Sequence, residues 1–187
     1  MGKYVVIEGV DTTGKSTQIT LLRKHYKNAI FTKEPSGSAF GEIVRDLALH
    51  KNLDNLTQTL LFLADRADNT HKVIRPNDDK LIISDRSLIS GIAYSQLDFT
   101  LAKEINLAVA KRPNLAIILE TNEAILTSRL ERKNSDDIES RGIKYLLEVQ
   151  NKIIKTAEIL NIKSIRIPCD KAINEISLDI IKAIDSI

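Results

Sequence analysis

The sequence contains a single cysteine, Cys169, among its 187 residues, and this scarcity excludes two kinds of site. One cysteine cannot close an internal disulfide, and no His or Cys residues with metal-ligand spacing surround it, so a zinc site is excluded as well. We interpret Cys169 as a small apolar residue near a strand end. The composition is that of a protein of a reducing compartment, and we expect a cytoplasmic location.

The chain also lacks a strong net charge and a long apolar run. Its 27 basic and 25 acidic residues give a net charge of +2, too weak a field to indicate nucleic acid or a membrane surface as a partner. No apolar stretch approaches a membrane span, and the N-terminal one turns polar before it reaches signal-peptide length. We therefore expect small-molecule partners, no nucleic acid, no membrane, and only local basic sites.

No internal repeat is present; instead, five short apolar runs alternate with segments of helical periodicity. The runs span Tyr4–Ile7, Ala29–Thr32, Leu81–Ser84, Leu115–Leu119 and Ser164–Ile167. Such alternation predicts an α/β fold with a doubly wound, five-stranded parallel sheet and helices on both faces. The length and the 43% hydrophobic content suit one domain over residues 1–187.

The strongest motif follows the first predicted strand. It is a complete Walker A pattern between a strand and a helix, and it reads Gly9, Val10, Asp11, Thr12, Thr13, Gly14, Lys15, Ser16 and Thr17. Glycines let the backbone curl so that its N–H groups converge on phosphate oxygens, while the following helix directs its positive end there. We expect Lys15 to reach the β- and γ-phosphates of ATP and the Ser16 hydroxyl to ligate Mg²⁺.

A second candidate site follows the third predicted strand, which delivers Asp85 and Arg86 to the carboxyl edge of the sheet. Doubly wound folds bind ligands at this edge. We expect Asp85 to hold the metal ion, directly or through water, and Arg86 to contact phosphate.

Three further features indicate that a small nucleotide is the second ligand. The core stripe expected on the segment 56–67 runs through Leu56, Leu60, Leu63, Ala64 and Ala67 and leaves Phe62 and Arg66 together on another face, where a flat ring and a forked donor suit a nucleobase. Arg45, with Arg86, offers two guanidinium groups to a monophosphate. Glu34, Pro35, Ser36 and Gly37 follow the second predicted strand as a rigid turn at the same sheet edge.

Over nearly its whole length the chain resembles the bacterial thymidylate kinases, a family of P-loop nucleoside monophosphate kinases. The resemblance rests on motifs spread along the chain: Glu8–Asp11 with Gly14–Gln18, Lys33–Gly37, Gly41, Glu42 and Arg45, Phe62–Ala67, Asp85–Ser87, Ser90, Ala93 and Tyr94, and Arg112–Leu115. It implies the P-loop NTP hydrolase/NMP kinase fold, phosphorylation of thymidine 5′-monophosphate (dTMP) by Mg·ATP, and a homodimer.

The resemblance also implies an acceptor site, made of Asp11, Glu34, Pro35, Arg45, Phe62, Arg66, Arg86, Ser90 and Tyr94. In it, Phe62 stacks on thymine and Arg66 hydrogen-bonds the base. Arg45 and Arg86 hold the acceptor phosphate, and Asp11 lies beside that phosphate and the sugar. The ring of Tyr94 crowds the ribose 2′ position and favours a deoxy sugar.

The family keeps a short mobile lid where this chain has the polar segment of about residues 129–142. By resemblance, Arg129 approaches the adenine and phosphates of ATP. The P-loop carries no arginine among its variable positions, so Arg132, Lys133 or Arg141 is expected to supply the transition-state cation. The catalytic set is thus Lys15, Asp11, Arg86, Arg132 and Lys133.

The chain departs from the family pattern at four positions: Ser36 stands where a second glycine is common, Ser87 for an aromatic residue, Gly91 for a hydroxyl residue and Glu120 for an aspartate. The residues alone leave open another small nucleoside or nucleotide kinase, such as a deoxynucleoside or cytidylate kinase. A P-loop switch without kinase activity also remains, although no Asn-Lys-x-Asp element for reading guanine occurs. A nucleic-acid-binding ATPase is disfavoured because no long basic stripe is present.

Overall fold

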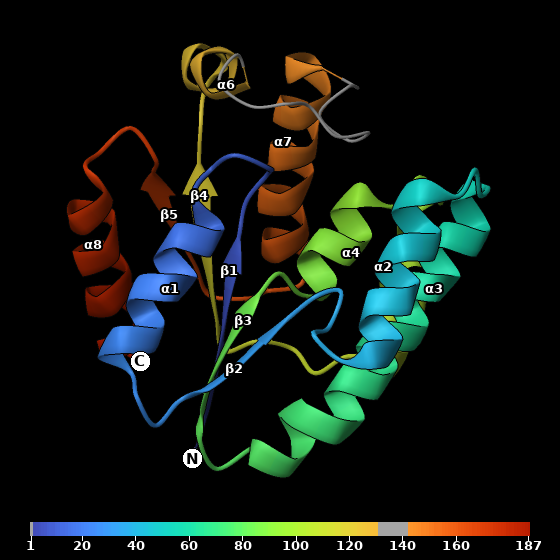
Figure 1. Cartoon of the computed structure of the whole chain (residues 1–187), viewed down its shortest axis with the longest axis horizontal. Coiled ribbons are helices and arrows are strands. Elements are labelled where there is room, and N and C mark those ends of the chain that lie inside the picture. Colours follow the sequence, from blue (N-terminus) through green and yellow to red (C-terminus); the bar gives the residue numbers. More distant parts are fainter. Residues whose placement is uncertain (1, 131–141) are drawn as a thin grey trace.

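A computed structural model describes residues 2–130 and 142–187 (Figure 1). Its centre is a sheet of five parallel strands in the order β2-β3-β1-β4-β5. The strands are β1 (Lys3–Glu8), β2 (Ile30–Lys33), β3 (Leu81–Asp85), β4 (Leu115–Glu120) and β5 (Ser164–Pro168). All five predicted strands are confirmed, with each end within one residue of its predicted position.

Helices connect these strands in the described part of the chain. They are α1 (Lys15–His25), α2 (Ala39–His50), α3 (Asn55–Asn69), α4 (Leu88–Tyr94), α5 (Phe99–Val109), α6 (Glu123–Leu130), α7 (Ile143–Ile159) and α8 (Ile173–Asp185). A short π-helix (η1, Thr70–Ile74) and a 3-10 turn (η2, Arg75–Asn77) follow α3. In residues 2–130 and 142–187, no helix is long and apolar enough to cross a bilayer.

The two faces of the sheet carry separate apolar cores, because side chains alternate along each strand. On one face, Tyr4 and Val6 of β1 pack in a cluster with residues of α4 and α7. On the other, Val5 and Ile7 pack in a cluster with residues of α1 and α8. Figure 1 shows α1 and α8 on one side of the sheet and α4 and α7 on the other. The fold is therefore doubly wound, as predicted.

The strand order places the P-loop at a point of reversal in the sheet. β1 lies between β3 and β4. The chain forms β2 and β3 on one side of β1 and then crosses to form β4 and β5 on the other side. Crevices form outside the carboxyl ends of strands at such a reversal. The segments that follow β1, β2 and β3 therefore converge on one edge.

The predicted core stripe of α3 is wrong. Leu63 is buried, but Leu56 and Leu60 are 49% and 51% exposed, and Ala64 is also exposed. The helix instead buries polar side chains, with Asp65 and Arg66 at 1% and 4% exposure. The inward face of α3 is polar because it lies against the Glu34–Ser36 turn, whose polar groups it satisfies by hydrogen bonds.

Candidate functional site

One cleft of about 650 Å³ opens at the carboxyl edge of the sheet. Its walls come from the P-loop, the turn after β2, helices α2, α3 and α4, and the start of α7. The lining residues are Asp11, Thr12, Gly14, Lys15, Ser16, Thr17, Lys33, Glu34, Pro35, Arg45, Gln58, Thr59, Phe62, Asp65, Arg66, Asp85, Arg86, Ser90, Gly91, Tyr94, Ser95 and Tyr145. All nine residues of the predicted acceptor site are among them.

The P-loop owes its shape to backbone conformations that favour glycine. Gly9 has φ = 146°, and a Cβ there would lie 2.9 Å from the carbonyl oxygen of Leu119. Gly14 has φ = 96° just before α1 begins. Thr13 steadies the turn by donating its hydroxyl proton to the Val10 carbonyl at 2.8 Å. The other six residues of the predicted motif line the cleft, whereas Gly9, Val10 and Thr13 do not.

Lys15 is a buried cation at the floor of this loop. Its Nζ donates to the carbonyl oxygen of Val10 at 2.8 Å. Burial, with repulsion from Arg86 as the next cause, lowers the pKa of Lys15 from 10.5 to about 8, while Asp11 and Asp85 oppose the change. A phosphate anion at the loop would favour the charged lysine, so the site is electrostatically prepared for one.

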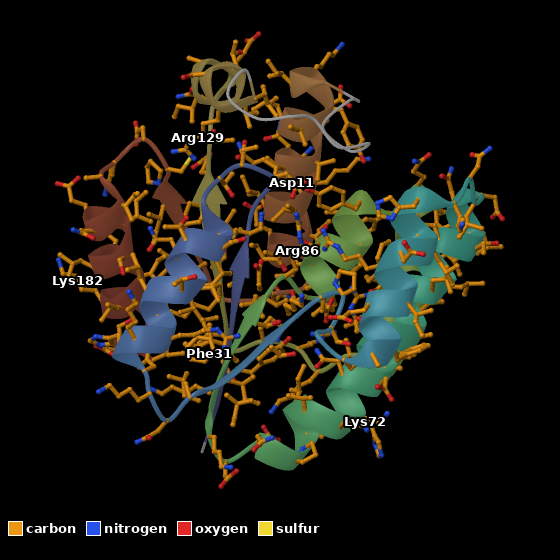
Figure 2. The ribbon with its side chains drawn as sticks, viewed as in Figure 1. Asp11, Phe31, Lys72, Arg86, Arg129 and Lys182 are labelled. Carbon is orange, nitrogen blue, oxygen red and sulfur yellow. The ribbon has the colours of Figure 1, made fainter. Side chains whose placement is uncertain are left out.

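Arg86 stands at the centre of the cleft, held from several sides. Its Nη2 donates to Asp11 Oδ1 at 2.5 Å, and its Nη1 donates to Ser90 Oγ at 3.2 Å and to the Gly9 carbonyl at 3.3 Å. The guanidinium carbon lies 5.0 Å from the centre of the Tyr94 ring. Figure 2 shows Asp11 and Arg86 near each other above the sheet. These contacts fix a forked donor at the mouth of the P-loop.

Glu8, which the sequence reasoning did not single out for a role, lies behind Arg86. Its carboxyl group is fully buried and accepts from the hydroxyls of Ser87, at 2.6 Å, and Ser90. Burial raises the pKa of Glu8, and the two serine hydroxyls oppose that rise. Ser87 also caps α4 by accepting from the Ile89 amide. This double use gives Ser87 a structural role at the position where the family commonly has an aromatic residue.

Asp85 and Ser16 offer oxygen atoms to a metal ion. Asp85 Oδ1 is buried without a hydrogen-bond partner among the described residues, and Ser16 is exposed in the first turn of α1. No cluster of three or more acidic, His or Cys side chains suited to a metal ion occurs in residues 2–130 and 142–187. Mg²⁺ usually takes one or two protein oxygens together with phosphate oxygens and water. The donor set therefore fits Mg²⁺ that arrives with a nucleotide.

On the α3 wall of the cleft, Arg66 forms a buried ion pair with Glu34. Arg66 Nε and Nη2 donate to Glu34 Oε2 at 2.8 Å and 2.6 Å, and Nη1 donates to Asn106 Oδ1 at 2.6 Å. Phe62 lies one helical turn earlier on α3 and lines the same cleft. The structure thus brings the predicted pair together, and it adds Asn106, which the sequence reasoning missed.

Asp65 fastens the turn after β2 to α3. Its carboxylate accepts from the Ser36 amide at 2.7 Å and from the Ser36 hydroxyl at 2.6 Å. A Cβ on Gly41 would lie 2.2 Å from Ser36 Oγ, so the first turn of α2 packs closely against the hydrogen-bonded pair of Ser36 and Asp65. Ser36, which stands where the family commonly has a glycine, supplies the hydroxyl for this pair. The two hydrogen bonds between Ser36 and Asp65 fix the backbone that carries Glu34.

Arg129, the predicted ATP contact on α6, does not line the cleft. Its Nη1 donates to the Thr12 carbonyl at 2.8 Å and its Nη2 to the Cys169 carbonyl at 2.7 Å. It therefore ties the P-loop to the segment after β5. The predicted lid cations Arg132, Lys133 and Arg141, like most of the lid segment 129–142, lie outside the described residues.

The arrangement combines an anion site and a site for a flat polar ring within one cleft. Lys15 and Arg86 bond residues of the P-loop, Arg45 comes from α2, and Phe62 and Arg66 come from α3; all five line the cleft. Such a cleft can hold one nucleotide by its phosphates at the loop and a second by its base at α3. Phosphoryl transfer between them needs positioning and positive charge, which the residues supply.

Comparisons with known proteins agree with this geometry. The thymidylate kinase family model matches residues 7–180. The chain is 40% identical to the thymidylate kinase of Sulfurimonas denitrificans over 97% of this chain and 99% of that protein. It is 49% identical to the thymidylate kinase of Helicobacter hepaticus over 87% of this chain and 88% of that one.

A solved structure is similar as well. The crystal structure of thymidylate kinase from Ehrlichia chaffeensis superposes with a TM-score of 0.78, at 25% identity and over 98% of both chains. The range of the family model, residues 7–180, includes all residues that line the cleft. The chain therefore belongs to the thymidylate kinase family.

Proposed function

We propose that the cleft binds dTMP and Mg·ATP side by side and transfers the γ-phosphoryl group between them, giving dTDP and ADP on the route to dTTP. Membership of the thymidylate kinase family makes the chain an ATP:dTMP phosphotransferase. The observation that carries the proposal is the continuity of one cleft from Lys15 in the P-loop to Phe62 and Arg66 on α3.

The acceptor base occupies the far part of the cleft. Phe62 stacks on the ring, and Arg66 donates to a base oxygen, since a guanidinium group only donates hydrogen bonds. Tyr94, on α4, lines the cleft between the base and the phosphates, where its ring crowds a ribose 2′-hydroxyl and favours a deoxy sugar. Glu34 and Pro35 form the wall beside Arg66.

The acceptor phosphate lies between the guanidinium groups of Arg45 and Arg86. Arg86 is already oriented by Asp11 and Ser90, so little ordering is required when phosphate arrives. Arg45 is exposed on α2 and completes the clamp from the opposite wall. Asp11 lies beside the acceptor phosphate and sugar and keeps Arg86 aligned with the line of transfer.

The donor phosphates bind the P-loop. Backbone N–H groups from Gly9 to Thr17 and the positive end of α1 hold the chain of phosphates, and Lys15 leaves the Val10 carbonyl to reach the transferred group. Ser16 and Asp85 would hold Mg²⁺, which would supply positive charge to the phosphates during transfer. Arg129 secures the loop, next to the adenine, and the lid cation stays a prediction for Arg132, Lys133 or Arg141.

We further propose a homodimer formed through α2 and α3. These helices pack side by side at the edge of the molecule farthest from α8 (Figure 1). They expose four large apolar side chains: Phe40 and Ile43 on α2, at 42% and 57%, and Leu56 and Leu60 on α3. Burying these side chains against a second copy removes apolar area from water. The same contact accounts for apolar residues on the outer face of α3.

The proposal treats residues 1–187 as a single P-loop kinase domain with a lid at about 129–142, which acts in the cytoplasm. One sheet with a core on each face supports the single domain. Cys169 is a buried free thiol, as suits a reducing compartment.

The function is tested by coupled ADP release with Mg·ATP and a panel of nucleoside and deoxynucleoside monophosphates, with thymidine as a nucleoside control. The account expects the highest kcat/KM with dTMP and no turnover with thymidine, which lacks the phosphate for Arg45 and Arg86. Preference for cytidine monophosphate would refute the role of Phe62 and Arg66 in selecting thymine. No ADP release with any acceptor would favour a nucleotide switch without kinase activity.

A further inference from the structure

We infer that Asn106 and Gly91 determine base specificity by fixing the position of Arg66. This inference rests on the proposed role of Arg66 in contacting the acceptor base. Asn106 lies on α5 and Gly91 on α4. Gly91 stood out in the sequence as a departure from the family's hydroxyl residue beside the acceptor pocket, whereas Asn106 did not stand out.

Asn106 is a fully buried amide that uses both of its polar ends. Its Oδ1 accepts from Arg66 Nη1 at 2.6 Å, and its Nδ2 donates to the carbonyl of Ala102, one turn earlier on α5, at 2.7 Å. The second bond sets the orientation of the amide, so that Oδ1 rather than Nδ2 faces the guanidinium. Asn106 therefore supplies an aligned acceptor from behind the cleft wall.

The hydrogen bonds of Arg66 to Glu34 and Asn106 leave some of its N–H donors available to a ligand. Of the five N–H donors of a guanidinium, three are used within the described residues, by Glu34 twice and by Asn106 once. One donor on each terminal nitrogen remains, while the group itself lines the cleft. Because Glu34 binds the Nε–Nη2 edge of the guanidinium and Asn106 binds Nη1, the group cannot rotate without breaking a buried hydrogen bond.

Gly91 leaves the room that this position of Arg66 requires. A Cβ at residue 91 would lie 2.6 Å from both Nη1 and Nη2 of Arg66 and 2.7 Å from the guanidinium carbon. All three distances are shorter than carbon makes with a non-bonded neighbour. Any side chain here forces Arg66 to move, so the family's usual hydroxyl residue is incompatible with the arginine in this position. The departure at Gly91 is thus coupled to the placement of Arg66.

The coupling has a chemical consequence for the substrate. A fixed guanidinium presents donors only, which match a carbonyl oxygen on the base edge and oppose an amino group. If Arg66 loses the hydrogen bond to Asn106 or is displaced by a side chain at residue 91, the guanidinium can move away from the base. A base with an amino group then no longer meets the N–H donors that repel it. Asn106 and Gly91 are therefore positioning residues, and Arg66 is the group that contacts the base.

The test compares kcat/KM for dTMP and for deoxycytidine monophosphate in the wild type, Asn106→Leu and Gly91→Ala. We expect each variant to lower the dTMP value by about tenfold to a hundredfold, the effect of losing a hydrogen bond to a charged group, with a smaller loss for deoxycytidine monophosphate. The KM for ATP should stay unchanged. As a control, Gln150→Leu removes a buried amide on α7 that bonds the backbone of Thr121 rather than Arg66, and it should leave the discrimination unchanged.

A double-mutant cycle separates the role in positioning from a general loss of packing. If Gly91 acts only by making room for Arg66, Gly91→Ala should have almost no effect on dTMP binding, measured by calorimetry, in an Arg66→Ala background. Equal effects in both backgrounds, or full discrimination in Gly91→Ala, would overturn the inference. A wild-type enzyme without a preference for dTMP would instead refute the acceptor assignment itself, which keeps the two failures distinct.

Discussion

Arg86 and Asp11 form an ion pair across the mouth of the P-loop, with Nη2 and Oδ1 2.5 Å apart. The two residues are 75 positions apart in the chain and meet because β1 and β3 are adjacent and parallel. Arg86 adopts φ = 71° immediately after β3, a conformation that is uncommon for residues other than glycine. This turn directs the guanidinium back over the P-loop. The pair thus joins the donor and acceptor parts of the cleft.

Replacing Arg86 by lysine should lower kcat with dTMP by about a hundredfold or more while the fold is retained. Lysine keeps the charge but cannot hold Asp11, Ser90 and a phosphate in one plane, because its ammonium group lacks the fork. Steady-state kinetics and circular dichroism of Arg86→Lys check this. Wild-type turnover in the variant would show that a point charge suffices.

Replacing Lys15 by alanine should abolish most turnover, by about a hundredfold to a thousandfold, without loss of stability. Burial lowers the pKa of Lys15 to about 8, so at pH 7 the folded protein carries a cation that its surroundings disfavour. Removing it should leave the melting temperature of the free protein equal or higher. The combination of lost activity and a clearly lower melting temperature would contradict this account of the lysine.

Glu8→Gln should change how stability depends on pH. Burial raises the pKa of Glu8, so the folded protein holds this proton to higher pH than the unfolded chain does. The stability from the protonated carboxyl is complete below the ordinary pKa of 4.5 and declines as pH rises through the folded-state value. The melting temperature of the wild type relative to Glu8→Gln should therefore fall with rising pH. A difference that grows in favour of the wild type would mean that the fold stabilises the carboxylate.

Much of the fold, and the position of the P-loop between β1 and α1, could be predicted because the signals are local. Buried parallel strands appear as continuous apolar runs, as in Leu115–Leu119, and the Walker A residues are contiguous. Asp85 and Arg86 could be placed because they follow a strand. Each of these inferences needs only neighbours in sequence.

The residues that were missed act through distant partners. Asn106 bonds Arg66 across 40 positions and Glu8 bonds Ser87 across 79. A buried asparagine or glutamate has no sequence pattern that distinguishes it from a surface one. The core stripe of α3 was wrong for a related reason. An apolar stripe indicates that one face of a helix is covered, but it does not show whether the core of the same chain or a second copy covers it. The apolar face of α3 is the one that we propose contacts a second copy.

Ile43→Glu should convert the proposed dimer to a monomer. The change places a charge within the exposed apolar surface on α2 and α3, where a paired copy would bury it without a partner. Light scattering coupled to size exclusion gives the mass directly. As a control, Lys72→Glu alters an exposed residue on η1, outside that surface, and should leave the mass unchanged. A variant with the mass of the wild-type assembly would exclude this surface as the interface.

The central claim is that the cleft transfers phosphate from ATP to dTMP, and product stoichiometry tests it most directly. The purified chain is incubated with Mg·ATP and limiting dTMP, and the nucleotides are separated and quantified. We expect equal amounts of dTDP and ADP in the wild type and neither product in Lys15→Ala. ADP without dTDP would show that water, not the acceptor at Phe62 and Arg66, receives the phosphoryl group, and it would contradict the account.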